Sequence, residues 1–573
     1  MPEADERCGV AAGDKRPATA HVRHRIAGGI VALTISAGVA YGQEAGPPGG
    51  GAPAAPAGPA APAGPAAPTT GGLPGAAPPG PPGGGPPSLL ITPSLQVQEQ
   101  FTDNVFETAT QRQGDAITIL TPGLAVSDQS ARVQGIFNYD PEAIKHVAVT
   151  SQDQVIQNFF GSGTLTAVPN LLFFDASATG SEASRIGGQG FGNTAQIPTS
   201  ASTQTYGYTG SPYMRFHFAD QGDLELRYRY GQTIFTGNTG AIVSPVPGES
   251  VNGISNSIVN DYSGKYVTGE AYGRLQLTFL ADYADYRSDN ALSSKSTTAS
   301  VDGTYVINNA WLALFNGGYD RLSYPGEPTD FEGAFNGLDY SAGFRYQPRE
   351  DRMVQLTYGR SQGQHVFAGS ANYALTKLTT LSASYSQQTS TPQQQLLQDL
   401  GQATQLTPGV TTNITTGLPQ PIVNPNLALQ NGVFHTQNLT AGVTMIGGAR
   451  NTYSLYFNRS VETALTAGSF SQTSDGVYLS WARAISPNAN GNLSGGYSTT
   501  SSAAIAGVGN TSSDSFTLTA SYNYTLTPTL SASASYQLIV QNGISGSVLG
   551  GPIGSSTGSV VVDLVTVGLQ KTF

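Results

Sequence analysis

From residue 88 onward, apolar and polar side chains alternate with a period of two, as in strands that bury only one face. Residues 516–526 show the pattern clearly, because apolar and aromatic side chains occupy every second position. After a short turn at Thr527 and Pro528, residues 530–540 alternate in the same way. These two segments predict an amphipathic hairpin.

Short turns and long polar loops alternate along the same part of the chain. The short turns are expected near residues 220–223, 308–309, 348–351, 376–378, 447–450 and 486–489. The long loops are expected at residues 185–204, 236–260, 390–431 and 541–558. Outer-membrane barrels have this asymmetry, with their short turns in the periplasm. We predict an all-β fold, a transmembrane antiparallel up-and-down β-barrel of about 22 strands (range roughly 16 to 24), over residues 88–573.

Soluble all-β folds fit the pattern less well. A β-propeller would repeat its blade residues every 40 to 50 positions or so, and a solenoid would have a shorter period. The chain shows only the hairpin rhythm, without repeated signature residues.

The last strand carries a candidate assembly signal. One parity holds Val561, Val565, Val567, Leu569 and Phe573, so the chain ends on an aromatic residue. Such a strand resembles the signal read by the barrel-assembly machinery, which is an expected partner together with outer-membrane lipid. Lys571 interrupts the apolar parity near the membrane edge, where its long side chain can reach water.

The amino terminus predicts export. A basic patch at residues 23–25 precedes the apolar stretch 26–39, and small residues follow. We expect residues 1–42 to be a signal peptide with a long n-region, cleaved between Gly42 and Gln43.

Residues 43–87 are almost wholly Gly, Ala and Pro, and we expect a disordered linker there. Barrels of about 22 strands include the plugged outer-membrane transporters. Since this linker lacks the side chains to fold as a plug, active uptake of that kind is not expected.

Composition excludes several function classes. Only 11% of residues are charged, and the formal net charge is −11, which argues against nucleic acid as a partner. The single cysteine lies before the predicted cleavage point, so the rest of the chain has no disulfide or thiol site. No segment has the roughly 20 apolar residues of a spanning helix.

No catalytic or metal-binding pattern occurs in the expected mature chain. Its histidines are His146, His217, His365 and His435, and none belongs to a metal-ligand motif. We expect no enzyme activity and no cofactor. A barrel hydrolase whose Ser, His and Asp come from distant strands stays a minor alternative.

The hairpin at residues 213–234 indicates which parity faces inward. Met214, Phe216, Phe218, Leu224, Leu226, Tyr228 and Tyr230 form an apolar set. The opposite parity carries the lumen-facing candidates Arg215, His217, Glu225, Arg227 and Arg229. Because lipid cannot solvate these charges, we expect them in the lumen. Two roles stay open for the arginines, namely guiding anionic solutes and pairing with carboxylates.

The start of the expected barrel resembles a known family. The string Thr102, Asp103, Asn104, Val105 and Phe106 ends its first strand, and residues 119–124 add a Thr-Pro-Gly element. Together they resemble the β-barrel porin 2 group and the related outer-membrane barrels of PEP-CTERM/exosortase systems. The resemblance implies an outer-membrane barrel that serves exopolysaccharide export. Asp103 and Asn104 could also act only as turn residues.

The sequence thus favours a porin-like channel in the bacterial outer membrane. Its solutes would be small polar molecules or, following the resemblance, a polysaccharide. The alternative is a non-conducting structural or surface-interaction barrel, which conductance measurements would distinguish.

Overall fold

The computed structural model describes residues 89–573 except for short internal segments. These are residues 185–201, 238–241, 244–249, 252–255, 290–292, 324–335, 362–363, 392–402, 408–409, 414–418, 421–432, 449, 466–470, 503–510 and 543–558. The described residues all belong to one compact unit, Pro59–Phe573. The predicted signal peptide, its cleavage point at Gly42 and Gln43, and the predicted linker lie outside the described residues and stay predictions.

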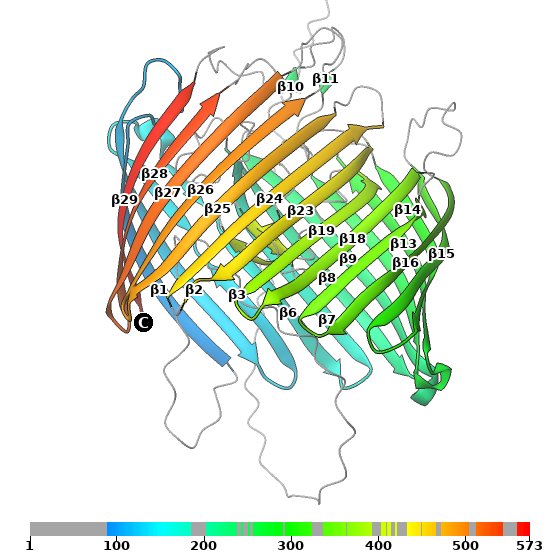
Figure 1. The fold of residues 1–573 in the computed structure, drawn as a ribbon. Coiled ribbons are helices and arrows are strands. Elements are labelled where there is room, and N and C mark those ends of the chain that lie inside the picture. The colour runs from blue at the N-terminus through cyan, green and yellow to red at the C-terminus, as the bar shows by residue number, and fades with distance from the viewer. Residues whose placement is uncertain are drawn as a thin grey trace, which may run out of the picture. The chain divides into compact units, whose positions relative to one another are not determined.

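The strands form one closed antiparallel barrel (Figure 1). They are β1 (Leu89–Thr102), β2 (Asp115–Gln129), β3 (Val133–Tyr139), β4 (Glu142–His146), β5 (Gln154–Ile156), β6 (Phe159–Val168), β7 (Leu172–Ser184), β8 (Ser202–His217), β9 (Gly222–Gly237), β12 (Ser257–Thr268), β13 (Leu275–Ser288), β14 (Ser294–Val306), β15 (Trp311–Ser323), β16 (Asn336–Arg349), β17 (Arg352–Ser361), β18 (Gln364–Thr376), β19 (Thr379–Ser390), β23 (Phe434–Ile446), β24 (Asn451–Ala464), β25 (Gln472–Ser486), β26 (Ala489–Ser502), β27 (Thr511–Thr527), β28 (Leu530–Asn542) and β29 (Val560–Thr572). Pairing of β1 with β29 closes the wall.

Two places in the wall are each filled by two short strands. β3 and β4 pair with β2 in one continuous register, although Asp140 and Pro141 interrupt them. β5 and β6 pair with β4 and β3 in the same way. Proline has no N–H to donate to the ladder, which accounts for the break at Pro141. The 24 strands of the sheet therefore form a barrel of 22 strand positions, which confirms the predicted fold class and strand number.

Connections at the two ends of the barrel differ in length, as predicted. One end has tight turns, such as residues 350–351, 377–378, 487–488 and 528–529, or single 3-10 turns, η3 (Ala219–Gln221) and η4 (Glu270–Tyr272). The other end carries the longer loops, which include η1 (Thr150–Gln152), β10 (Ile242–Val243), β11 (Ser250–Val251), β20 (Ala403–Thr407), β21 (Val410–Asn413) and β22 (Pro419–Gln420). By this asymmetry the tight-turn end is periplasmic.

The strand register separates an outer and an inner face. On β2, Ile117 and Ile119 are buried, whereas Leu120 and Leu124 between the same ladders are exposed. Residues that are paired in the register lie on the same face of the wall. Starting at Leu124 on β2, successive pairs across the neighbouring strands lead to β9 through Tyr139, Phe159, Gly180, Tyr206 and Ile234. Even-numbered residues of β9 therefore lie on the outer face with Leu124, and odd-numbered residues line the lumen.

Candidate functional site

The hairpin of β8 and β9 presents two chemically different faces. Met214 and Leu226 are directly paired and 42% and 43% exposed on the outer face. The register places Arg215 opposite Glu225, and both on the inner face. This separation follows from the period of two along each strand, which turns successive side chains to opposite faces.

Ion pairs hold the inner charges of this hairpin in place. The Arg227 guanidinium donates to Glu225 Oε1 and to Asp175 Oδ2 on β7, each at 2.8 Å, and to Ser211 Oγ at 3.0 Å. Arg215 Nε donates to the other carboxylate oxygen, Glu225 Oε2, at 2.9 Å. Three neighbouring strands are thus tied together, and charge-assisted bonds of this kind are stronger than neutral ones.

Aromatic rings lie beneath the same guanidinium groups. The Arg227 Cζ atom is 3.9 Å from the ring centroid of Tyr213, and Arg215 Cζ is 5.1 Å from it and 5.4 Å from that of Phe173. The two rings stack with centroids 5.1 Å apart. Tyr213 is only 5% exposed. Since Arg227 covers the buried Tyr213 ring, this ring supports the charged network and is not available for stacking against a sugar.

Carboxylates continue along the inner wall from this network. Arg229 Nη1 lies 3.4 Å from Asp261 Oδ2 on β12. One register row runs from Arg227 through Ser263, Asp282, Thr298 and Asp320 across β9 to β15. The arginines of β8 and β9 all have carboxylate partners, whereas Asp282 and Asp320 take part in no ion pair with a described residue.

His217, the remaining lumen candidate of the sequence, lies at the periplasmic end of β8. Its Nδ1 is 2.7 Å from Asp223 Oδ1, the first carboxylate after the η3 turn. Both side chains are largely exposed, so this pair lies at the rim and not in the arginine network.

The Asp103-Asn104 pair fastens the barrel where its first and last strands meet. Asp103 Oδ1 accepts the backbone N–H of Asp563 at 2.8 Å, beyond the last β1–β29 register pair. Asn104 is fully buried, and its amide donates to the carbonyl oxygens of Thr108 and Val561 at 2.8 and 3.1 Å. Thr102 Oγ1 accepts the Asn104 N–H at 3.2 Å. Both residues thus form hydrogen bonds at the seam, the junction of β1 and β29, and Asn104 also holds the loop 103–114.

This loop bends toward the inner wall. Val105 is 3% exposed and packs with Phe106 against inner residues of β2, and Ala109 packs against Val560 and Val562 of β29. Val105 and Phe106, the last two residues of the family-like string, therefore contribute to packing at the outer end of the barrel.

Glu107 lies in the same loop, with φ of 50°. Burial raises the pKa of the Glu107 carboxyl to about 7.

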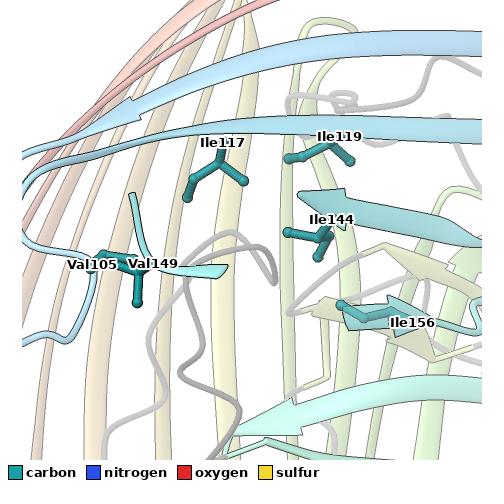
Figure 2. Packing of buried hydrophobic residues seen from close by; sticks show 6 residues of the cluster. All are labelled: Val105, Ile117, Ile119, Ile144, Val149 and Ile156. Carbon is teal, nitrogen blue, oxygen red and sulfur yellow. The ribbon is translucent and has the colours of Figure 1, made fainter. Parts of the chain in front are cut away.

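An apolar cluster inside the barrel was not predicted from the sequence. Figure 2 shows its six side chains, which come from β2, β4, β5 and two connecting segments. They are Val105, Ile117, Ile119, Ile144, Val149 and Ile156. Inward isoleucines on a barrel strand form a signal that could have been read, because they break the polar inner parity of β2. On this side the inner face of the wall is therefore apolar.

A buried His–Asp pair borders the cluster. His146 Nδ1 lies 3.1 Å from Asp115 Oδ2, and their side chains are 3% and 0% exposed. The Asp115 carboxylate also accepts the backbone N–H groups of Ala116, Ala148 and Val149. It thus fixes the segment between β4 and η1 to the inner wall.

The terminal strand turns its apolar parity to the outer face. Val565, Val567, Leu569 and Phe573 are all exposed. Lys571 Nζ donates to Thr529 Oγ1 at the periplasmic turn. An assembly role for this strand stays a prediction.

Within the described ranges, no group of three or more His, Cys, Asp or Glu residues could hold a metal ion. The same residues include no helix long and apolar enough to cross a membrane. The charged inner wall is therefore the site that the described residues offer.

Comparisons with known proteins found similarity only among solved structures. No family model and no curated protein matches the sequence, so the resemblance to the porin 2 group stays a prediction. Similar structures include the siderophore receptor PirA from Acinetobacter baumannii (9% identity, 84% of this chain and 80% of that chain, TM-score 0.45). Others are the FrpB iron transporter from Neisseria meningitidis, F5-1 variant (11%, 84% and 82%, TM-score 0.48), and a mutant of the ferric enterobactin receptor PfeA from Pseudomonas aeruginosa (11%, 84% and 80%, TM-score 0.40). The fold assignment rests on the strand pairing itself.

The location follows from the same pairing and from the outer surface. Exposed apolar and aromatic side chains occur on strands all around the wall, for example Val97, Leu165, Phe279, Phe315, Leu455 and Leu569. A closed antiparallel barrel with an apolar exterior satisfies its backbone internally and is solvated by lipid. The protein is an outer-membrane β-barrel.

Proposed function

We propose that this barrel is a passive channel that conducts small polar solutes across the outer membrane. The supporting observation is the inner wall itself, where Arg215, Glu225, Arg227 and Arg229 share a face with further carboxylates. A barrel of this size encloses a lumen wide enough for water, and charged groups are stable there only if water or partners solvate them.

The distribution of charge along the wall supports a preference for cations. Arg215, Arg227 and Arg229 are balanced by carboxylates at 2.8 to 3.4 Å. Asp282 and Asp320 add acidic groups that have no ion-pair partner among the described residues. Of the two roles left open for the arginines, the geometry favours pairing with carboxylates.

Planar-bilayer recording of the full-length protein tests this proposal. We expect stepwise conductance and, in a salt gradient at pH 8, a reversal potential on the cation side. Replacing Asp282 and Asp320 together by Asn should move the potential toward anions, because two acidic groups are lost from the wall. The double variant Arg227→Gln, Arg229→Gln should move it toward cations.

Protein that is folded and inserted but passes no current would contradict the channel. That result would favour the alternative of a non-conducting structural or surface-interaction barrel. If the reversal potential is unchanged in both double variants, the protein is still a channel, but the charges on this wall do not determine its ion selectivity.

Service in exopolysaccharide export is a finer proposal, and its support is the resemblance carried by residues 102–106 and 119–124. An acidic polysaccharide added to one side of the bilayer should then block the current reversibly. A current that is insensitive to such polymers of every length would contradict this substrate class.

A further inference from the structure

The outer face of the barrel has a hollow where small residues meet on adjacent strands. Gly264 on β12 pairs with Ala281 on β13, which pairs with Ala299 on β14. A cavity of about 690 Å³ lies along this row, and Leu226 and Tyr283 are among the residues that line it. Because the hollow lies on the lipid-facing side of the wall, it can receive part of a lipid molecule.

The backbone does not require glycine at this place. A Cβ atom added to Gly264 would find only Leu226 Cδ2 within 4 Å, at an ordinary contact distance of 3.5 Å. Gly264 also has no positive φ. A larger apolar side chain would therefore fit and would fill the hollow.

Three outward cations lie just above this hollow, near the outer ends of the strands. Thr297 borders the cavity and pairs directly with Arg321 on β15. Lys295 is two residues further up β14 and Arg287 is at the outer end of β13. Across neighbouring antiparallel strands, Lys295 is a diagonal neighbour of both arginines, at roughly 7 to 8 Å between Cα atoms. Long side chains can therefore converge on one ligand.

Protein carboxylates balance only part of this charge. Arg287 donates to Asp285 Oδ2 through Nη2 at 2.7 Å and through Nε at 3.0 Å, and its side chain is 70% exposed. Lys295 and Arg321 are exposed on the outer face and form no ion pair with a described residue. Among the described residues, Asp285 lies opposite Lys295 in the register. At this level of the membrane the lipid headgroup layer is a further source of negative charge.

From this arrangement we propose that the outer face of β12 to β15 binds a phosphorylated lipid of the outer leaflet. Arg287, Lys295 and Arg321 hold the phosphate, and one acyl chain lies in the hollow beside Gly264 and Ala281. Guanidinium groups suit a phosphate because they can donate two parallel hydrogen bonds. This site is independent of the lumen and of whether the barrel conducts.

The chain offers a matched control on another part of the wall. Arg459 on β24 is also exposed, with a side-chain exposure of 52%, but it lies 3.7 Å from Asp475 on β25. An arginine that already has a carboxylate partner should contribute little to phosphate binding.

Native mass spectrometry of the detergent-purified full-length protein tests the proposal with two lipids of identical acyl chains, phosphatidic acid and phosphatidylcholine. The native protein should retain phosphatidic acid preferentially. In the double variant Lys295→Gln, Arg321→Gln the affinity for phosphatidic acid should fall about thirtyfold, since two cations near the membrane surface are lost. Arg459→Gln should bind like the native protein.

Two further measurements separate the phosphate from the acyl chain. Gly264→Leu should weaken phosphatidic acid binding while all three cations remain. Inorganic phosphate at equal concentration should not displace the lipid. Each variant is first shown to be folded by its heat-dependent mobility in detergent gels.

The proposal is overturned if the folded cation double variant retains phosphatidic acid as the native protein does, or if Arg459→Gln loses it equally. Unchanged binding by Gly264→Leu, or full displacement by inorganic phosphate, would exclude the hollow as the acyl site.

Discussion

The Asp103 carboxylate accepts a hydrogen bond from the backbone N–H of Asp563 at 2.8 Å, although the two residues are 460 positions apart. Asn104 adds a bond to the Val561 carbonyl oxygen beside it. The β1–β29 seam is the last pairing that the chain can complete, because it needs both ends of the barrel. These side chains extend the seam past its last register pair, Thr102 with Leu564.

Removing the buried amide at this seam should destabilise the barrel. Asn104→Ala leaves carbonyl oxygens of Thr108 and Val561 without their donor, which costs roughly 1 to 3 kcal/mol. The unfolding midpoint in detergent with urea measures it. Asn490→Ala, at an exposed position of β26, is the control and should change little. Equal midpoints for both variants would show that the seam bonds do not contribute.

The two faces of β9 should respond in opposite ways to charge. Leu226→Arg places a cation on the lipid face and should cost roughly 2 to 4 kcal/mol near the bilayer midplane. Arg227→Gln should still assemble, because the lumen can solvate a polar amide. Assembly is measured by heat-dependent mobility after refolding into vesicles. The reverse outcome would mean that the strand register is shifted by one residue, which exchanges the two faces.

A side chain at Gly123 of the Thr-Pro-Gly element should displace two neighbouring polar groups. An added Cβ would lie 2.2 Å from Ser94 Oγ and 2.6 Å from Asp140 Oδ1, so both of these side chains would have to turn away. Because both atoms are at the ends of side chains that can rotate, Gly123→Ala should cost about 1 kcal/mol. Gly317→Ala, where the added atom meets nothing within 4 Å, is the matched control. Denaturant unfolding that gives the same midpoint for both variants would contradict this reading of the element.

The loop 103–114 should loosen as pH rises. The pKa of Glu107 is raised from 4.5 to about 7 by burial, so the packed loop binds the proton more tightly than the open loop does. Packing is then favoured most below about pH 4.5 and loses stability up to about pH 7. Hydrogen exchange of the loop at pH 5 and pH 8, corrected for intrinsic rates, measures the effect. Glu107→Gln should keep its protection at pH 8, while Glu350→Gln in a periplasmic turn should behave like the native protein.

Export and the linker give a further prediction. Amino-terminal sequencing of protein extracted from the membrane should begin at Gln43, because small residues precede it after the apolar stretch.

Deleting most of residues 43–87 with the signal retained should leave the barrel in the outer membrane, since a solvated spacer contributes no packing. Loss of the barrel after this deletion would show that the segment folds or directs assembly.

Local patterning was sufficient to determine the barrel. The alternation at residues 516–526 reflects the turn of successive side chains to opposite faces, and closely spaced turns such as the one after Thr527 fix the hairpin rhythm. These properties depend on neighbours in the chain, so fold class, strand number and the difference between the two ends could be predicted from the sequence.

Only the tertiary structure decided which side chains meet. Arg227 lies 52 positions from Asp175, and Asp103 lies 460 positions from Asp563, so no local pattern relates them. The inward position of Ile117 beside Val105 likewise depends on a loop that bends into the barrel mouth. A period of two specifies the face of each residue, but contacts across strands depend on register and closure, which the whole chain sets together.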